Sequence, residues 1–246
     1  MDCEAVLFDL DDTLYPYGPC DEAGRRAAFE AYRDRGGELG ADAFESRRLR
    51  ARRATKREVG GTASGHSRHL YYERLVADLP GSFDAGLALA LGDAYWDAFL
   101  AEMTAFEDAA DTLAALSDAG VDVGVVTNLT VRIQLRKLTE LGVDRHLDAF
   151  VTSEEVGREK PAAPVFTTAL ARLGRTPAGT LVVGNSPRAD IEGGNALGMT
   201  TALFNGPDDA PAPAGADGDA AADDGTALRR PDRRLDSLSA VTEVAL

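Results

Sequence analysis

The first strand-length apolar run of this chain ends in a cluster of carboxylates. Residues 6–14 read VLFDLDDTL, so Asp9, Asp11 and Asp12 stand within four positions of one another. Carboxylates this close raise one another's pKa unless a cation lies among them. Asp9 and Asp11 alternate with Leu10, and an extended backbone would point both the same way. A buried strand has no structural use for such a tip, which therefore points to a ligand site.

Two carboxylates at one strand tip fit two kinds of chemistry. They offer oxygen ligands to a hard divalent cation such as Mg²⁺. They also allow a division of labour in which one carboxylate attacks and the other carries a proton. The alternative is a solvated turn in which Asp12 or Thr13 caps a helix. We favour the functional interpretation for Asp9 and Asp11, because ligands bind at the carboxyl ends of strands in open α/β sheets.

The second half of the chain alternates between apolar runs and helical periodicity. This pattern predicts an α/β fold, a doubly wound parallel sheet covered on both faces. The expected strands are residues 5–10, 121–126, 150–152, 181–184, 200–204 and 233–235. The expected helices are residues 108–119, 130–141, 162–173, 188–197 and 237–245.

A different pattern separates the first expected strand from the second. Glycine-rich breaks divide this region into four helical stretches and no comparable β-run. These stretches are residues 21–35, 42–58, 66–79 and 84–101. We therefore expect a core domain of residues 1–16 and 105–246 with a helical insert, residues 17–104. Residues 206–230 are mostly Ala, Asp, Gly and Pro, a composition that predicts a mobile acidic loop within the core.

Three further strand ends carry polar residues with two interpretations each. Thr127 and Asn128 form either a phosphate seat or the N-cap of the next helix. Lys160 is either a surface lysine before a helix-starting proline or a residue of the site, and it is one of only three lysines among 26 basic residues. That scarcity favours a site that needs a compact ammonium. Asn185 and Asp190 form the far wall of a cation site, or Asp190 only interacts favourably with the dipole of the helix in whose first turn it lies.

Charge and cysteine usage restrict the partners and the compartment. The net charge of −15 repels nucleic acid and anionic membranes. The chain has only Cys3 and Cys20, whose spacing fits no metal motif, and its acidic N-terminus is unlike a secretory signal. These features indicate a reducing cytoplasm. The excess of Asp and the scarcity of Lys resemble the composition of proteins from salt-loving archaea.

The four polar strand ends, taken in order, resemble the motifs of the haloacid dehalogenase-like (HAD) hydrolase superfamily. They read FDLDDTL, VVTN, EKPAAPVF and VGNSPRAD. The resemblance covers residues 4–20 and 105–204, and it extends to 232–245. It implies a Rossmann-like core, and the insert resembles the helical cap of that family.

The resemblance also implies a role for each residue of these motifs. Asp9 would be the nucleophile that forms an aspartyl-phosphate, and Asp11 the general acid and base. Thr127 and Asn128 would bind phosphoryl oxygens, with Lys160 neutralising charge. The ligands of Mg²⁺ would be Asp9, the Asp11 carbonyl, Asn185 and Asp190. Asn185 stands where the family usually has an acid, which weakens the expected metal affinity.

The resemblance predicts a reaction class and leaves two alternatives. The carboxyl group of Asp11 favours phosphate ester hydrolysis, because dehalogenases of the family have no acid there. The expected activity is Mg²⁺-dependent hydrolysis of a small phosphorylated metabolite. A phosphomutase would share all four motifs. Asn185 leaves open a third possibility, a member that binds a phosphorylated metabolite or a protein without turnover.

Substrate choice is expected in the helical insert. Its second helical stretch gathers the only basic patch of an acidic chain, and Arg50, Arg53 and Arg57 fall on one helical face. We interpret most of this patch as a solvated face that neutralises nearby acids. The aromatic residues of the insert are expected to form its own core.

Overall fold

The computed structural model describes residues 3–206 and 227–246. The chain divides into two compact units, one of Met1–Pro16 with Thr104–Leu246 and the other of Tyr17–Met103. We call them the sheet unit and the helical unit. Most of the acidic loop expected over residues 206–230 lies outside the described residues. Within the described ranges, no helix is both long enough and apolar enough to cross a bilayer.

The sheet unit contains a parallel sheet in the order β3-β2-β1-β4-β5-β6. Its strands are β1 (Ala5–Phe8), β2 (Asp122–Thr127), β3 (Ala149–Thr152), β4 (Thr180–Gly184), β5 (Thr200–Phe204) and β6 (Arg233–Leu235). All the pairings are parallel, and Phe8 of β1 lies opposite Val125 of β2 and Val183 of β4. The predicted α/β fold with a doubly wound parallel sheet is confirmed. The strand order reverses at β1, where such sheets bind their ligands.

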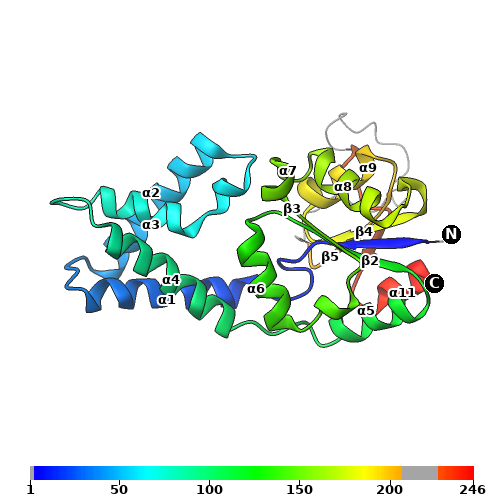
Figure 1. Ribbon diagram of the computed structural model, residues 1–246, viewed down its shortest axis with the longest axis horizontal. Helices are drawn as coiled ribbons and strands as arrows, with labels where there is room; N and C mark the ends of the chain where they lie inside the picture. The colour runs from blue at the N-terminus through cyan, green and yellow to red at the C-terminus, as the bar shows by residue number, and fades with distance from the viewer. Residues whose placement is uncertain (1–2, 207–226) are drawn as a thin grey trace. The chain divides into compact units, whose positions relative to one another are not determined.

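Helices cover both faces of this sheet, with α8 and α9 on one side and α5 and α11 on the other (Figure 1). The bounds are α5 (Ala109–Asp118), α6 (Val131–Leu141), α7 (Ser153–Val156), α8 (Ala163–Leu173), α9 (Glu192–Ala196) and α11 (Ala240–Ala245). Short 3₁₀ turns span Asp144–His146 and Pro177–Gly179. Leu7 and Val126 of the sheet pack with Phe166 and Leu170 of α8 in a buried cluster. This apolar layer fixes the strand ends from which the polar side chains project.

Two differences from the expected bounds in the sheet unit have a clear cause in the backbone. The first strand ends at Phe8 rather than at residue 10, because the chain turns away after Asp9 and Asp12 takes a left-handed φ of 61°. The helix expected over 188–197 is divided into a π-helical turn, Pro187–Ile191, and α9. Ile191 N donates to Ser186 O at 3.3 Å, a bond to the fifth residue back that widens the turn.

The helical unit contains α1 (Tyr17–Asp34), α2 (Ala41–Val59), α3 (Arg68–Ala77) and α4 (Ala85–Ala101), with a 3₁₀ turn at Ala63–His66. Helix α3 begins later than expected because Ser67 caps it, its hydroxyl accepting from Leu70 N at 3.2 Å. Buried aromatic rings form the core of this unit, and Trp96 meets Tyr95 and Phe99 edge-on. These contacts agree with the core expected for the aromatic residues.

Candidate active site

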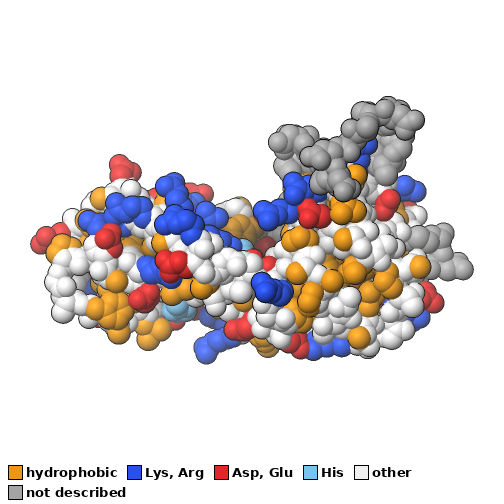
Figure 2. All heavy atoms as spheres, turned by 90° about the horizontal axis from the view of Figure 1, so that it is seen from above, with side chains coloured by type: hydrophobic (Ala, Val, Ile, Leu, Met, Phe, Trp, Pro, Cys, Tyr) orange, Lys and Arg blue, Asp and Glu red, His pale blue; other side chains and the backbone are white. Residues whose placement is uncertain are grey.

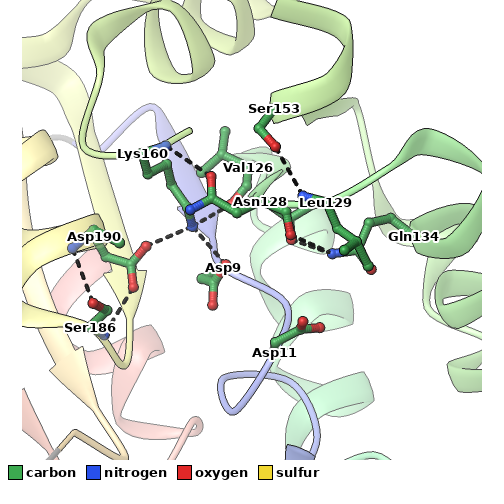
Figure 3. Close-up of polar contacts among 12 residues, drawn as sticks. Asp9, Asp11, Val126, Asn128, Leu129, Gln134, Ser153, Lys160, Ser186 and Asp190 are labelled. Carbon is green, nitrogen blue, oxygen red and sulfur yellow. Dashed lines mark hydrogen bonds and ion pairs between the residues drawn. The ribbon is translucent and has the colours of Figure 1, made fainter. Parts of the chain in front are cut away.

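The carboxyl ends of β1, β2 and β4 bring polar side chains together around one ammonium (Figure 3). Asp9 follows β1, and its amide still donates to Val183 O of β4 at 2.8 Å. Lys160 Nζ donates to Asp9 Oδ1 and to Asp190 Oδ1, each at 2.6 Å. It also donates to Val126 O of β2 at 2.7 Å. The ammonium of Lys160 thus donates three hydrogen bonds to three segments of the chain, which fixes the position of the Asp9 carboxylate.

Burial makes this charge cluster unusual. The side chains of Lys160 and Asp190 are only 2% and 1% exposed, and that of Asp9 is 11% exposed. Burial raises the pKa of Asp9 to about 7, the negative charges of Asp190 and Asp11 add to the rise, and Lys160 opposes it. Burial disfavours the charged form of Lys160, but the negative charges of Asp190 and Asp9 outweigh this effect and raise the pKa of Lys160. Two carboxylates around one ammonium leave the cluster short of positive charge.

The loop after β4 holds Asp190 against this ammonium. Ser186 N donates to Asp190 Oδ2 at 3.0 Å, while Ser186 Oγ accepts from Ala189 N at 3.0 Å. A Cβ at Gly184 would lie 2.3 Å from Cγ of Asp190, a distance that excludes any side chain there. The glycine at the end of β4 therefore makes room for the buried carboxylate.

Thr127 and Asn128 lie at the end of β2, as expected, and both have protein partners. Gln134 Nε2 of α6 donates to Thr127 Oγ1 at 2.5 Å. Asn128 Oδ1 accepts from the backbone amide of Lys160 at 2.8 Å, so it links two of the motifs. Neither residue caps α6, whose first amide, Val131 N, donates to Glu154 Oε2 at 2.7 Å. The capping alternative is therefore wrong for both residues, and their binding of phosphoryl oxygens stays a prediction.

Asp11 lies on the loop after Asp9 and has a cation of its own. Lys137 Nζ of α6 donates to Asp11 Oδ1 at 2.6 Å, and Tyr15 Oη donates to the same oxygen at 2.7 Å. Sequence reasoning missed Lys137, Gln134 and Tyr15. A signal for Lys137 was present, because the scarcity of lysine that singled out Lys160 applies equally to Lys137.

Oxygen donors near Asp9 suit a magnesium ion. Asp9 Oδ2 has no protein partner among the described residues. Asp11 follows the end of β1, and Asn185 follows the end of β4. The shortage of positive charge around Lys160 is what a divalent cation would offset. Asp190 uses both carboxylate oxygens for Lys160 and Ser186, so it would reach a cation only through a remaining lone pair. The described residues contain no ready-made cluster of three His, Cys, Asp or Glu.

The arginine-rich face expected in the insert gathers on α2 and α3. Arg50, Arg53 and Arg57 line one surface cavity of the helical unit, and Figure 2 shows basic side chains on this face. Asp78 binds Arg47 and Arg50 there, each at 2.8 Å. Glu58 binds Arg74 at 2.7 Å. These pairs agree with the interpretation of the patch as a face that neutralises nearby acids.

The chain belongs to the haloacid dehalogenase-like hydrolases. That family matches residues 3–198, and a related HAD-hydrolase-like family matches residues 157–240. Phosphatases are among the relatives of this chain. The chain is 44% identical to the ribulose-1,5-bisphosphate 5-phosphatase of Halopiger xanaduensis, over 98% of each chain. It is 35% identical to the glyceraldehyde 3-phosphate phosphatase of Methanopyrus kandleri, over 80% of this chain and 82% of the relative. Family and relatives identify the protein as a phosphoric monoester hydrolase, as predicted.

Solved structures show the same fold. The magnesium-bound HAD-hydrolase YfnB from Bacillus subtilis matches with a TM-score of 0.70 at 20% identity, covering 100% of this chain and 99% of the other. The 2-haloacid dehalogenase of Pseudomonas syringae also has a TM-score of 0.70, at 24% identity, covering 98% and 97%. Phosphatases and dehalogenases share this architecture, so the choice of reaction depends on individual residues.

Proposed function

We propose that the protein is a Mg²⁺-dependent phosphatase that hydrolyses a small phosphorylated sugar through an aspartyl-phosphate on Asp9. One observation carries this proposal: Lys160 binds Oδ1 of a buried Asp9 at 2.6 Å and leaves Oδ2 for attack. The second carboxylate, Asp11, follows two residues later and can carry the proton. Phosphoryl transfer requires mainly positioning and charge stabilisation, which these groups supply.

The charge balance of the site supports a metal requirement. With both carboxylates ionised, Asp9, Asp190 and Lys160 sum to one negative charge, and a phosphomonoester adds about two more near neutral pH. Asp9, the Asp11 carbonyl and Asn185 would hold the Mg²⁺, with Asp190 at the edge of the site. A bound Mg²⁺ would neutralise charge on the phosphoryl group. Lys160 would contribute in the same direction through its fixed ammonium.

The relatives suggest the first substrates to test. The 44% identity to a ribulose-1,5-bisphosphate 5-phosphatase extends over nearly all of both chains. We therefore propose ribulose 1,5-bisphosphate as the first substrate and glyceraldehyde 3-phosphate as the second. The acidic, lysine-poor composition supports a role in a salt-rich cytoplasm, so both should be assayed at low and at multimolar salt.

Phosphate release from these esters, with Mg²⁺ and with a chelator, tests the proposal. We expect Asp9→Asn to abolish release and to leave the far-UV circular dichroism spectrum unchanged, because an amide is a far weaker nucleophile than a carboxylate. Asp118→Asn, at an exposed position in α5, is the matched control and should retain full activity. Substantial turnover by folded Asp9→Asn would contradict the proposal. An isomerised sugar phosphate in place of free phosphate would indicate a mutase.

A further inference from the structure

A lysine with no exposed surface lies behind Asp11. Lys137 is 0% exposed, whereas the Asp11 side chain that it binds is 29% exposed. Its Nζ lies 2.6 Å from Asp11 Oδ1 and 5.6 Å from the ring centroid of Tyr15. Tyr15 Oη binds the same Asp11 oxygen at 2.7 Å. The ammonium, the phenol and one carboxylate oxygen form a compact group at Asp11.

Packing alone does not explain a lysine at this position. A buried ammonium is costly unless a partner of opposite charge compensates for its lost hydration. The neighbouring buried residues of α6 include Ile133 and Leu138, so an apolar side chain would suit this face of the helix. The chain has only three lysines, and this one meets a carboxylate of the proposed site. Binding to Asp11 is therefore the reason for the charge.

The same helix supports a second residue of the site. Gln134 precedes Lys137 by three positions, and both side chains are fully buried. Gln134 binds the Thr127 hydroxyl at 2.5 Å, as Lys137 binds the Asp11 carboxylate. Helix α6 thus presents two buried polar groups, each directed at a different residue of the site.

We propose that Lys137 is a positioning residue for the general acid and base of this enzyme. This proposal rests on the proposed function, in which Asp11 exchanges a proton with the substrate. Lys137 and Tyr15 both donate to Oδ1, and an oxygen that accepts two such bonds does not carry the proton. The proton therefore belongs to Oδ2. The two hydrogen bonds to Oδ1 from Lys137 and Tyr15, which we call the clamp, fix the direction in which Oδ2 presents the proton.

The two half-reactions define what the clamp must hold. In the first, Asp9 Oδ2 bonds to phosphorus, the bond to the leaving oxygen breaks, and the proton on Asp11 Oδ2 passes to that oxygen. In the second, Asp11 Oδ2 takes a proton from water as the water oxygen bonds to phosphorus. The Asp9–phosphorus bond then breaks and releases phosphate. The proton transfers require the same Asp11 oxygen at the same place in both steps.

The test compares Lys137→Met with Asp11→Asn on two esters, a sugar phosphate and p-nitrophenyl phosphate. The leaving group of the second ester barely needs a proton. We expect Lys137→Met to lower kcat on the sugar phosphate by about 10- to 100-fold, and by less than about 3-fold on the activated ester. The double variant that combines Lys137→Met with Asp11→Asn should be no slower than Asp11→Asn alone, because positioning the carboxyl group has no effect once the acid is absent. Arg132→Met, which removes a charge at an exposed position of α6, is the control and should match the wild type.

Tyr15→Phe gives a second variant if Lys137→Met does not fold. It removes only the hydroxyl and should cause a smaller loss with the same selectivity for the sugar phosphate. Equal losses on both esters, or a double variant slowed by the product of the two single effects, would overturn the proposal.

Crystal structures of the wild type and Lys137→Met provide a readout that does not depend on turnover. The clamp predicts that the Asp11 carboxylate changes its side-chain conformation in the variant. An unmoved Asp11 would overturn the proposal even in an active enzyme. A wild type that releases no phosphate from any ester would instead overturn the proposed function.

Discussion

Replacing Lys160 with Met tests the charge balance at the centre of the site. The substitution keeps an unbranched side chain as far as Cε, removes the ammonium, and leaves Asp9 and Asp190 facing each other without a cation. Removing one member of a buried ion pair costs about 3–5 kcal/mol, because the remaining charge is left uncompensated. Asp190 is 1% exposed and Asp9 only 11%, so water can relieve little of this cost. We therefore expect the free energy of unfolding of the sheet unit to fall by about 3–5 kcal/mol.

The assay must report on the sheet unit. The single tryptophan, Trp96, lies in α4 of the helical unit, so its fluorescence reports on the other part of the chain. Amide hydrogen exchange of peptides from β1 and β4, measured by mass spectrometry, follows the strands that hold Asp9 and Asp190. Arg132→Met, at an exposed position, is the control and should change the free energy by no more than about 0.5 kcal/mol.

A double variant separates the charge effect from a general loss of packing. Adding Asp190→Asn to Lys160→Met removes one of the two unpaired charges, and the amide oxygen can still accept from Ser186 N. The double variant should therefore be more stable than Lys160→Met alone by at least about 1 kcal/mol. The reasoning would be refuted if the stability losses of Lys160→Met and Asp190→Asn simply added in the double variant, or if Lys160→Met alone cost less than about 1 kcal/mol.

Two other substitutions test the proton and metal roles. Asp11→Asn should lower turnover of the sugar phosphate by about 10²–10⁴-fold and of p-nitrophenyl phosphate by much less; equal losses would exclude the acid role. Asn185→Asp should lower the half-saturating Mg²⁺ concentration at fixed salt, because a charged ligand replaces a neutral dipole beside the cation. An unchanged Mg²⁺ titration would mean that Asn185 does not contact the ion.

The sheet and its strand tips could be predicted because their signals are local. Apolar runs that end in Asp9, Thr127 and Gly184 define β1, β2 and β4, and parallel pairing brings their carboxyl ends together. The geometry after each tip was less predictable. A uniform helix after Ser186 fits the sequence, but Asp190 N and Ile191 N both donate to Ser186 O and form a π turn. That turn carries Asp190 back to Lys160, a contact 30 residues away in sequence.

The partners of Asp11 show why part of the site was hidden. Lys137 is 126 residues from Asp11, and the pattern of α6 gives no indication of which residue it binds. Only packing of α6 beside the loop after β1 makes the pair. Asn128 is a similar case, because its amide oxygen accepts from the Lys160 backbone, a contact that depends on the approach of two loops.

Asp9 and Asp11 stand two residues apart, yet the fold gives them different surroundings. Asp9 is nearly buried and shares Lys160 with Asp190, a second carboxylate. Asp11 is more exposed and binds Lys137 and Tyr15 through one oxygen. One acid can attack and the other carry a proton only if the environment distinguishes them. The two scarce lysines of the sheet unit supply that distinction, since Lys160 binds Asp9 and Lys137 binds Asp11. Both residues are aspartates, so we expect their different roles to depend on these surroundings and to change only if the contacts of the two lysines change.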